Sequence, residues 1–175
     1  LGLAAMVPAS LPSPKSVNPL HVWAGHVDPA HLDAWVNGHL DAQQQAIQQL
    51  LAVKGTRTVA NTLTLYDRAN AELTIAGTET YLMYAVSPDK SVRDHANALV
   101  QKVGQASTAL SLNQDVYRAL VAIDAAKADP ATQYYLKRTL LEYRLAGVDK
   151  DAATRKRVQQ LSDEITKISL TFGRN

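Results

Sequence analysis

The chain has 175 residues, of which 46% are hydrophobic and 19% are charged, with only 8 Gly and 7 Pro. This composition excludes a disordered or collagen-like chain and fits one globular domain, with or without a short appendage. The 18 Lys and Arg exceed the 16 Asp and Glu by a net charge of only +2, which does not predict nucleic-acid binding. The absence of Cys excludes disulfides, thiolate metal sites and a cysteine nucleophile.

Residues 1–17 are predicted to form an irregular leader. A short apolar run at 1–7 is followed by a Pro/Ser stretch that ends at Pro14. This order fits the tail of a signal peptide and its cleavage region, and a flexible leader or tag remnant fits equally well. The compartment therefore stays open: cytoplasmic or, if the leader is a signal-peptide remnant, periplasmic or secreted. No stretch reaches the roughly 18 apolar residues that a membrane span needs.

From about Pro29 the pattern predicts a succession of helices, because apolar residues recur every three or four positions. The first helix begins after Asp28, a good N-cap residue, and has Pro29 at its first position, where no N–H is needed. It ends near Lys54-Gly55, a basic last turn followed by a glycine. Its apolar face consists of Leu32, Val36, Leu40, Ile47, Leu50 and Leu51.

The second helix is predicted over about 61–84, and the third opens at Ser87-Pro88 with the same capping chemistry as the first. Gly77 and the alanines of the second helix would let a neighbouring helix approach closely. The apolar stripes are Tyr66, Ala69, Leu73, Ala76 and Met83 in the second helix, and Val92, Ala96, Leu99, Val103, Ala106 and Leu110 in the third.

A short fourth helix is predicted after Asn113, and a fifth begins at Asp129-Pro130 and ends at Gly147. The fourth carries Val116, Tyr117, Leu120 and Ile123. The apolar residues of the fifth surround much of its circumference, so we expect it to pack on several sides. They are Tyr135, Leu136, Leu140, Leu141 and Tyr143.

The last helix is predicted over about 151–172. Its apolar residues follow at alternating steps of three and four, which is the spacing of a seam for antiparallel or coiled-coil-like packing. They are Val158, Leu161, Ile165, Ile168 and Phe172. The basic triplet at 155–157 is interpreted as a solvated face, and Asp163 with Lys167 as a favourable i,i+4 pair. The fold class predicted is all-α, a bundle of five to six helices with an irregular N-terminal leader.

The sequence shows no assembled catalytic constellation. A zinc site of the metallopeptidase type needs two His four residues apart on one helix with a Glu between them, and no pair here has that spacing. The histidines are His21, His26, His31, His39 and His95, and we interpret them as helix-surface or interface residues. Serine-nucleophile and phosphate-binding glycine motifs are absent. We therefore assign no catalytic, cofactor-binding or metal-ligating residue.

Several segments, taken in order, resemble the family of zinc metallopeptidases that includes thimet oligopeptidase, neurolysin and oligopeptidase A. The closing segments that carry the resemblance are Tyr143 to Val148, Arg155 to Ile165 and Leu170 to Asn175. Upstream segments are similar in the same order: His26 to Ala30, Ala69-Asn70 and Leu112 to Tyr117. The resemblance covers about residues 18–175.

The resemblance implies that residues 18–175 are the helical N-terminal domain of a zinc-dependent oligopeptidase, a metalloendopeptidase that hydrolyses short peptides. In this family, zinc held by His-Glu-x-x-His and a more distant Glu activates water. Those ligands belong to a later part of the family's chain, so we expect no zinc or other cofactor on this chain and no activity from it alone. The implied partners are the downstream catalytic domain of the same protein and, in the full enzyme, short peptides held in a channel.

Two other interpretations stay open. One is a stand-alone helical module for protein interaction or regulation, descended from such a domain. The other is a small metal-binding protein that uses His31 and His39, which lie eight residues apart on one face of the first predicted helix.

Overall fold

The computed structural model describes residues 21–23 and 26–173, so the predicted leader at 1–17 lies outside the described residues. Within the described part, six α-helices are joined by short links that hold one π-helical turn and one pair of two-residue strands. The predicted all-α class is confirmed. No helix in this part is both long and apolar enough to cross a lipid bilayer.

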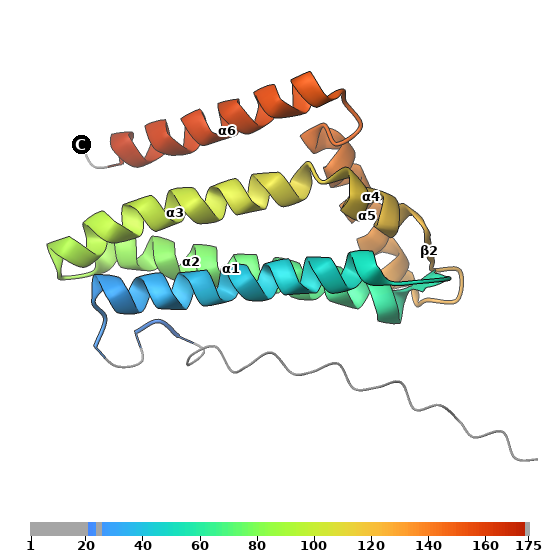
Figure 1. Ribbon diagram of the computed structural model, residues 1–175, viewed down its shortest axis with the longest axis horizontal. Helices are drawn as coiled ribbons and strands as arrows, with labels where there is room; N and C mark the ends of the chain where they lie inside the picture. Colours follow the sequence, from blue (N-terminus) through green and yellow to red (C-terminus); the bar gives the residue numbers. More distant parts are fainter. Residues whose placement is uncertain (1–20, 24–25, 174–175) are drawn as a thin grey trace, which may run out of the picture.

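Three long helices lie side by side and form the body of the fold (Figure 1). At one end of this layer lie two shorter helices, and the last helix lies along the outer side of α3. The elements are α1 (Pro29–Ala52), β1 (Arg57–Thr58), η1 (Val59–Leu63), α2 (Thr64–Val86), α3 (Lys90–Ser111), α4 (Gln114–Val121), β2 (Ile123–Asp124), α5 (Pro130–Ala146) and α6 (Ala152–Phe172).

Side-chain caps begin five of the six helices. The capping residues are Asp28, Asp89, Asn113, Asp129 and Asp151, each of which accepts a hydrogen bond from a backbone N–H of the first turn. Such a cap satisfies one of the amide groups that have no partner inside the helix. The predicted caps of α1, α4 and α5 are confirmed, as is the glycine that ends α5.

The prediction that Ser87 caps the third helix, with Pro88 at its first position, is wrong. Ser87 instead ends α2, because its N–H donates to the carbonyl oxygen of Met83 at 3.2 Å. Asp89 caps α3, and both the hydroxyl and the N–H of Ser91 donate to its carboxylate at 2.8 and 2.7 Å. These hydrogen bonds lower the pKa of Asp89.

The chain enters α2 through the π-helical turn η1, slightly before the predicted start of the second helix. Thr58 and Asn61 cap this turn reciprocally: the Thr58 hydroxyl accepts from the Asn61 N–H, and the Asn61 side chain accepts from the Thr58 N–H. β1 pairs in parallel with β2, with Arg57 opposite Ile123. The end of α4 is thereby fixed beside the entry to α2.

The core lies between α1, α2 and α3. Leu32, Trp35 and Leu50 of α1 are fully buried, and burying a side chain of this kind stabilises the fold by about 1.5–3 kcal/mol. Gly77 lies against α3 as expected, but a Cβ atom placed there would lie 3.5 Å from Cγ1 of Val103, an ordinary contact distance, so the packing of α2 on α3 does not depend on a glycine at this position. Of the apolar residues predicted for the first helix, Leu51 is exposed.

The prediction that the fifth helix packs on several sides is wrong for the described part of the chain. α5 buries one side only, through Leu136, Thr139 and Tyr143. Tyr134 and Leu145 on the opposite side are 69% and 74% exposed. The reason is its position, because α5 lies at the end of the bundle and packs mainly on α4.

Candidate functional site

α6 is attached to the bundle through a narrow stripe of mostly small side chains. Val158, Ser162 and Thr166 are half-buried, and Leu170 is buried, at intervals of four residues. Thr166 lies against Gly104 of α3, where an added Cβ atom would sit 3.7 Å from its side chain. The small side chains of Ser162 and Thr166 let α6 lie close to α3.

A hydrogen bond from α2 fastens the C-terminal end of α6. The hydroxyl of Tyr84 donates to the carbonyl oxygen of Leu170 at 3.1 Å. At the other end, the carboxylate of Asp151 caps α6, and Gly147 makes the preceding turn with a φ of 96°. These contacts fix how α6 is rotated about its axis.

The large apolar residues of α6 form a second stripe that faces solvent. Their exposed fractions are 40% for Leu161, 63% for Ile165, 66% for Ile168 and 82% for Phe172. At 100° per residue, the centre of this apolar stripe lies about 110° around the helix from the stripe that faces α3. Of the predicted seam, only Val158 turns toward the bundle and is half-buried. That the other four residues form a seam for antiparallel or coiled-coil-like packing stays a prediction, since they are exposed within the described part of the chain.

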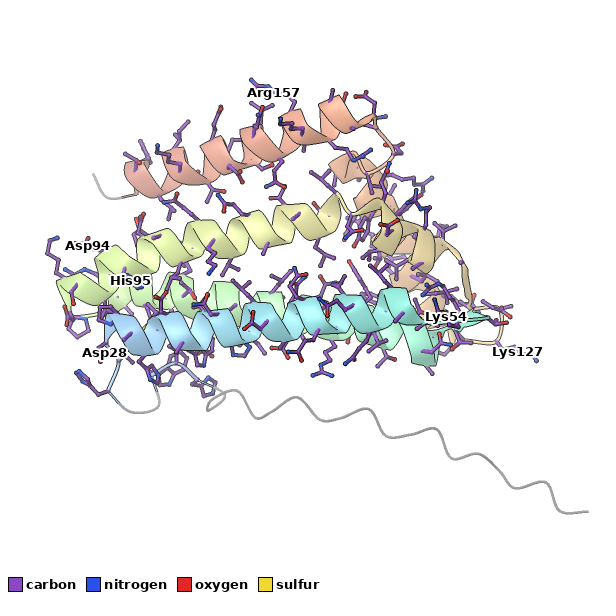
Figure 2. The ribbon with its side chains drawn as sticks, in the orientation of Figure 1. Asp28, Lys54, Asp94, His95, Lys127 and Arg157 are labelled. Atoms are coloured by element: carbon purple, nitrogen blue, oxygen red, sulfur yellow. The ribbon has the colours of Figure 1, made fainter. Side chains whose placement is uncertain are left out.

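The apolar stripe has charged borders. Figure 2 shows Arg157 on the outer side of α6, pointing away from α3. Lys156 and Arg157 are exposed, as predicted for a solvated face, whereas Arg155 is half-buried and donates to the carbonyl oxygen of Lys150. Asp163 accepts a hydrogen bond from Gln159 at 3.0 Å, so its nearest partner is not the Lys167 that the sequence predicts. A shallow groove next to the stripe is lined by Glu164, Lys167, Ile168, Thr171 and Phe172.

A second cavity, of about 540 Å³, lies where α2, α3 and the end of α6 meet, and its lining includes Tyr81, Lys90 and Arg93. Its cationic groups already have partners. Arg93 donates to the carbonyl oxygens of Ser87 and Pro88 at 2.5 and 3.0 Å, and Lys90 pairs with Asp94 at 2.5 Å. Both cationic side chains of the described lining therefore have partners within the protein.

His21, His39 and His95 each lie beside a different carboxylate. Nδ1 of His39 lies 2.6 Å from Glu72, Nδ1 of His21 lies 2.8 Å from Glu79, and Nε2 of His95 lies 3.2 Å from Asp33. Figure 2 shows His95 and Asp94 at the end of α3 that lies beside the start of α1. Within residues 21–23 and 26–173, no group of three His, Cys, Asp or Glu is placed to hold a metal ion.

The two histidines considered for metal binding, His31 and His39, contact different groups. Nε2 of His31 donates to the carbonyl oxygen of Val22 at 3.1 Å, whereas His39 is buried against α2 beside Trp35, with ring centroids 4.2 Å apart. The geometry agrees with an interface role for His39 and does not direct the two imidazoles at a shared ion.

Val22 is held against the bundle by groups from two helices. Its side chain is fully buried, its N–H donates to the buried carboxylate of Glu79 at 2.7 Å, and His31 donates to its carbonyl oxygen. Glu79 also pairs with His21. Sequence reasoning missed these contacts of Val22, because the residue precedes the first predicted helix in a segment that shows no helical or strand periodicity.

Four tyrosines join α2, α4 and α5. Ring centroids of Tyr66 and Tyr117 lie 6.0 and 5.9 Å from that of Tyr143, and the hydroxyl of Tyr135 donates to Asp67 at 3.2 Å. Burial raises the pKa of Tyr66 and Tyr143, and burial together with the Asp67 carboxylate raises the pKa of Tyr135 to about 12. These three phenols stay protonated at neutral pH and tie helices together.

Comparison with known proteins gives a distant similarity. No protein-family model matches the sequence. A thimet-like oligopeptidase from Dictyostelium discoideum is 25% identical over 145 residues, which cover 78% of this chain and 21% of the relative. The chain thus spans about a fifth of the length of the curated relative that it matches. The similarity supports a distant link to the oligopeptidases.

Proposed function

We propose that residues 18–175 form a helical domain of a zinc-dependent oligopeptidase and make part of one wall of the channel that receives short peptides. The similarity to the thimet-like oligopeptidase over 145 residues carries this proposal. The ordered segments that resemble the oligopeptidase family, closing with residues 155–165 and 170–175, support it. The proposed partner is the catalytic domain of the same protein.

The described side chains do not fit a catalytic zinc site. Such a site needs three protein ligands that converge on one ion. His21 and His39 instead pair with different carboxylates of α2, and His31 contacts the carbonyl oxygen of Val22. In the proposal, zinc and its ligands belong to another part of the enzyme, as the family resemblance implies. No catalytic step is assigned to residues of this chain.

In this proposal, the domain determines the shape of part of the peptide channel. α1, α2 and α3 have 24, 23 and 22 residues, so each is a rod about 33–36 Å long. Their shared core is closely packed, and packed interiors resist deformation. A wall built from such helices would keep a channel narrow, so that unstructured peptides enter and folded proteins do not.

The gene sequence separates this proposal from the stand-alone interaction module. We expect the reading frame to continue past Asn175 and to encode His-Glu-x-x-His in the remaining protein. A stop codon directly after Asn175 would overturn the proposal in favour of the module.

A further inference from the structure

We infer that the solvent-facing stripe of α6, formed by Leu161, Ile165, Ile168 and Phe172, is the docking surface for an amphipathic helix of the zinc-bearing part of the enzyme. This inference rests on the proposed function, and it assigns a surface and a kind of partner to it. Scattered apolar residues are normal on a protein surface, whereas a contiguous apolar patch marks an interaction site.

The outward direction of the stripe is set by the packing of the rest of α6. The hydrogen bond from Tyr84 of α2 to Leu170 and the contact of Thr166 with Gly104 of α3 hold the other stripe of α6, about 110° away, against the bundle. Rotating α6 to bury Ile165 and Ile168 would break both contacts. Rotation of α6 about its own axis therefore cannot bury the apolar stripe without loss of these two contacts.

The spacing of the four apolar residues along α6 indicates that the partner segment is a helix. Steps of four, three and four residues place the four side chains along one line, as in the a and d positions of a coiled coil. From Leu161 to Phe172 the line is about 16 Å long, which matches three turns of a partner helix. Arg157, Glu164 and Lys167 border it, so the partner helix should flank its apolar residues with charges of both signs.

The occupant is assigned to the same enzyme because of how much protein the relative has beyond the match. The thimet-like oligopeptidase is matched over only 21% of its length, so under the proposed function most of the enzyme, including its zinc-bearing part, lies outside the matched segment and is available to cover the stripe. A second copy of the chain is the competing occupant, and the experiment below separates the two.

Thiol labelling tests the inference, because the 175-residue chain has no Cys. Ile168→Cys places one thiol on the stripe, and Lys156→Cys places a control thiol on an exposed position away from it. Labelling rates are measured at each introduced thiol, by peptide mass spectrometry, in the 175-residue chain and in the intact gene product. We expect the thiol of Ile168→Cys to react at least about tenfold more slowly in the intact enzyme, and the control thiol to react equally in both.

Each of the other outcomes overturns the inference, and each identifies a different cause. If the intact protein is an active zinc peptidase and the thiol of Ile168→Cys reacts equally fast in both proteins, the inference fails and the proposed function stands. If the 175-residue chain sediments as a dimer and Ile165→Glu makes it monomeric, a second copy covers the stripe. If the intact protein has no zinc-dependent peptidase activity, the proposed function fails and the inference falls with it.

Discussion

The buried carboxylate of Glu79 on α2 accepts a hydrogen bond at 2.7 Å from the backbone N–H of Val22, which lies 57 residues earlier in the chain. This contact joins the segment before α1 to the second helix. Because Val22 is fully buried, its N–H has no access to water that could replace the carboxylate. The contact therefore matters more than an exposed hydrogen bond would.

Glu79→Ala should lower the free energy of unfolding by about 1–3 kcal/mol, because it leaves a buried N–H without an acceptor. Urea denaturation followed by circular dichroism measures the change. Glu164→Ala, at an exposed position of α6, is the matched control and should change stability by less than about 0.5 kcal/mol. Equal urea midpoints for the two variants would contradict a stabilising role for the hydrogen bond between Val22 and Glu79.

Gly147→Ala should destabilise the protein by about 1–2 kcal/mol, because φ at this position is 96° and a Cβ atom is unfavourable there. Gly104→Ala is the matched control. The added methyl group at Gly104 would lie at an ordinary contact distance of 3.7 Å from Thr166, and alanine is the better helix former. Thermal melts should show a lower Tm for the first variant and an equal or higher one for the second.

Leu32→Ala should cost about 2–5 kcal/mol, because it opens a cavity in the fully buried core. Leu145→Ala should cost less than about 0.5 kcal/mol, because this side chain of α5 is 74% exposed. Chemical denaturation of the purified chain compares them. A large loss in the second variant would mean that a further element covers the outer side of α5.

The unfolding free energy should fall between pH 10 and about 12, in part because of Tyr135. Its pKa is raised to about 12 in the folded chain from 10.0, so the unfolded state loses this proton first, and stability that is complete below pH 10 is lost as the pH rises. Tyr135→Phe should make the decline shallower. Urea midpoints at pH 8 and pH 11 measure it, and an unchanged decline would exclude a raised pKa at Tyr135.

The start of each helix could be predicted wherever capping chemistry was unambiguous, as at Asp28, Asn113 and Asp129. The start of α3 could not, because Ser87-Pro88 and Asp89 offer competing caps and the hydrogen bond from Ser87 to the end of α2 decides between them. A local pattern does not contain this tertiary information.

The buried side of α6 could not be predicted either. Hydrophobicity alone would place Leu161, Ile165 and Ile168 inside. In the structure, the stripe of Val158, Ser162, Thr166 and Leu170 lies against the bundle instead. The apolar spacing was correctly recognised, but it describes a surface that no other described residue covers. The link between Val22 and Glu79 was missed for a related reason, since it joins residues 57 positions apart.

Zinc-dependent hydrolysis of an internally quenched peptide, measured for the 175-residue chain and for the intact gene product, tests the proposed function most directly. The account predicts no turnover by the chain alone at any added zinc concentration. It also predicts turnover by the intact protein that a chelator removes and zinc restores. Zinc-dependent turnover by the purified 175-residue chain would contradict it.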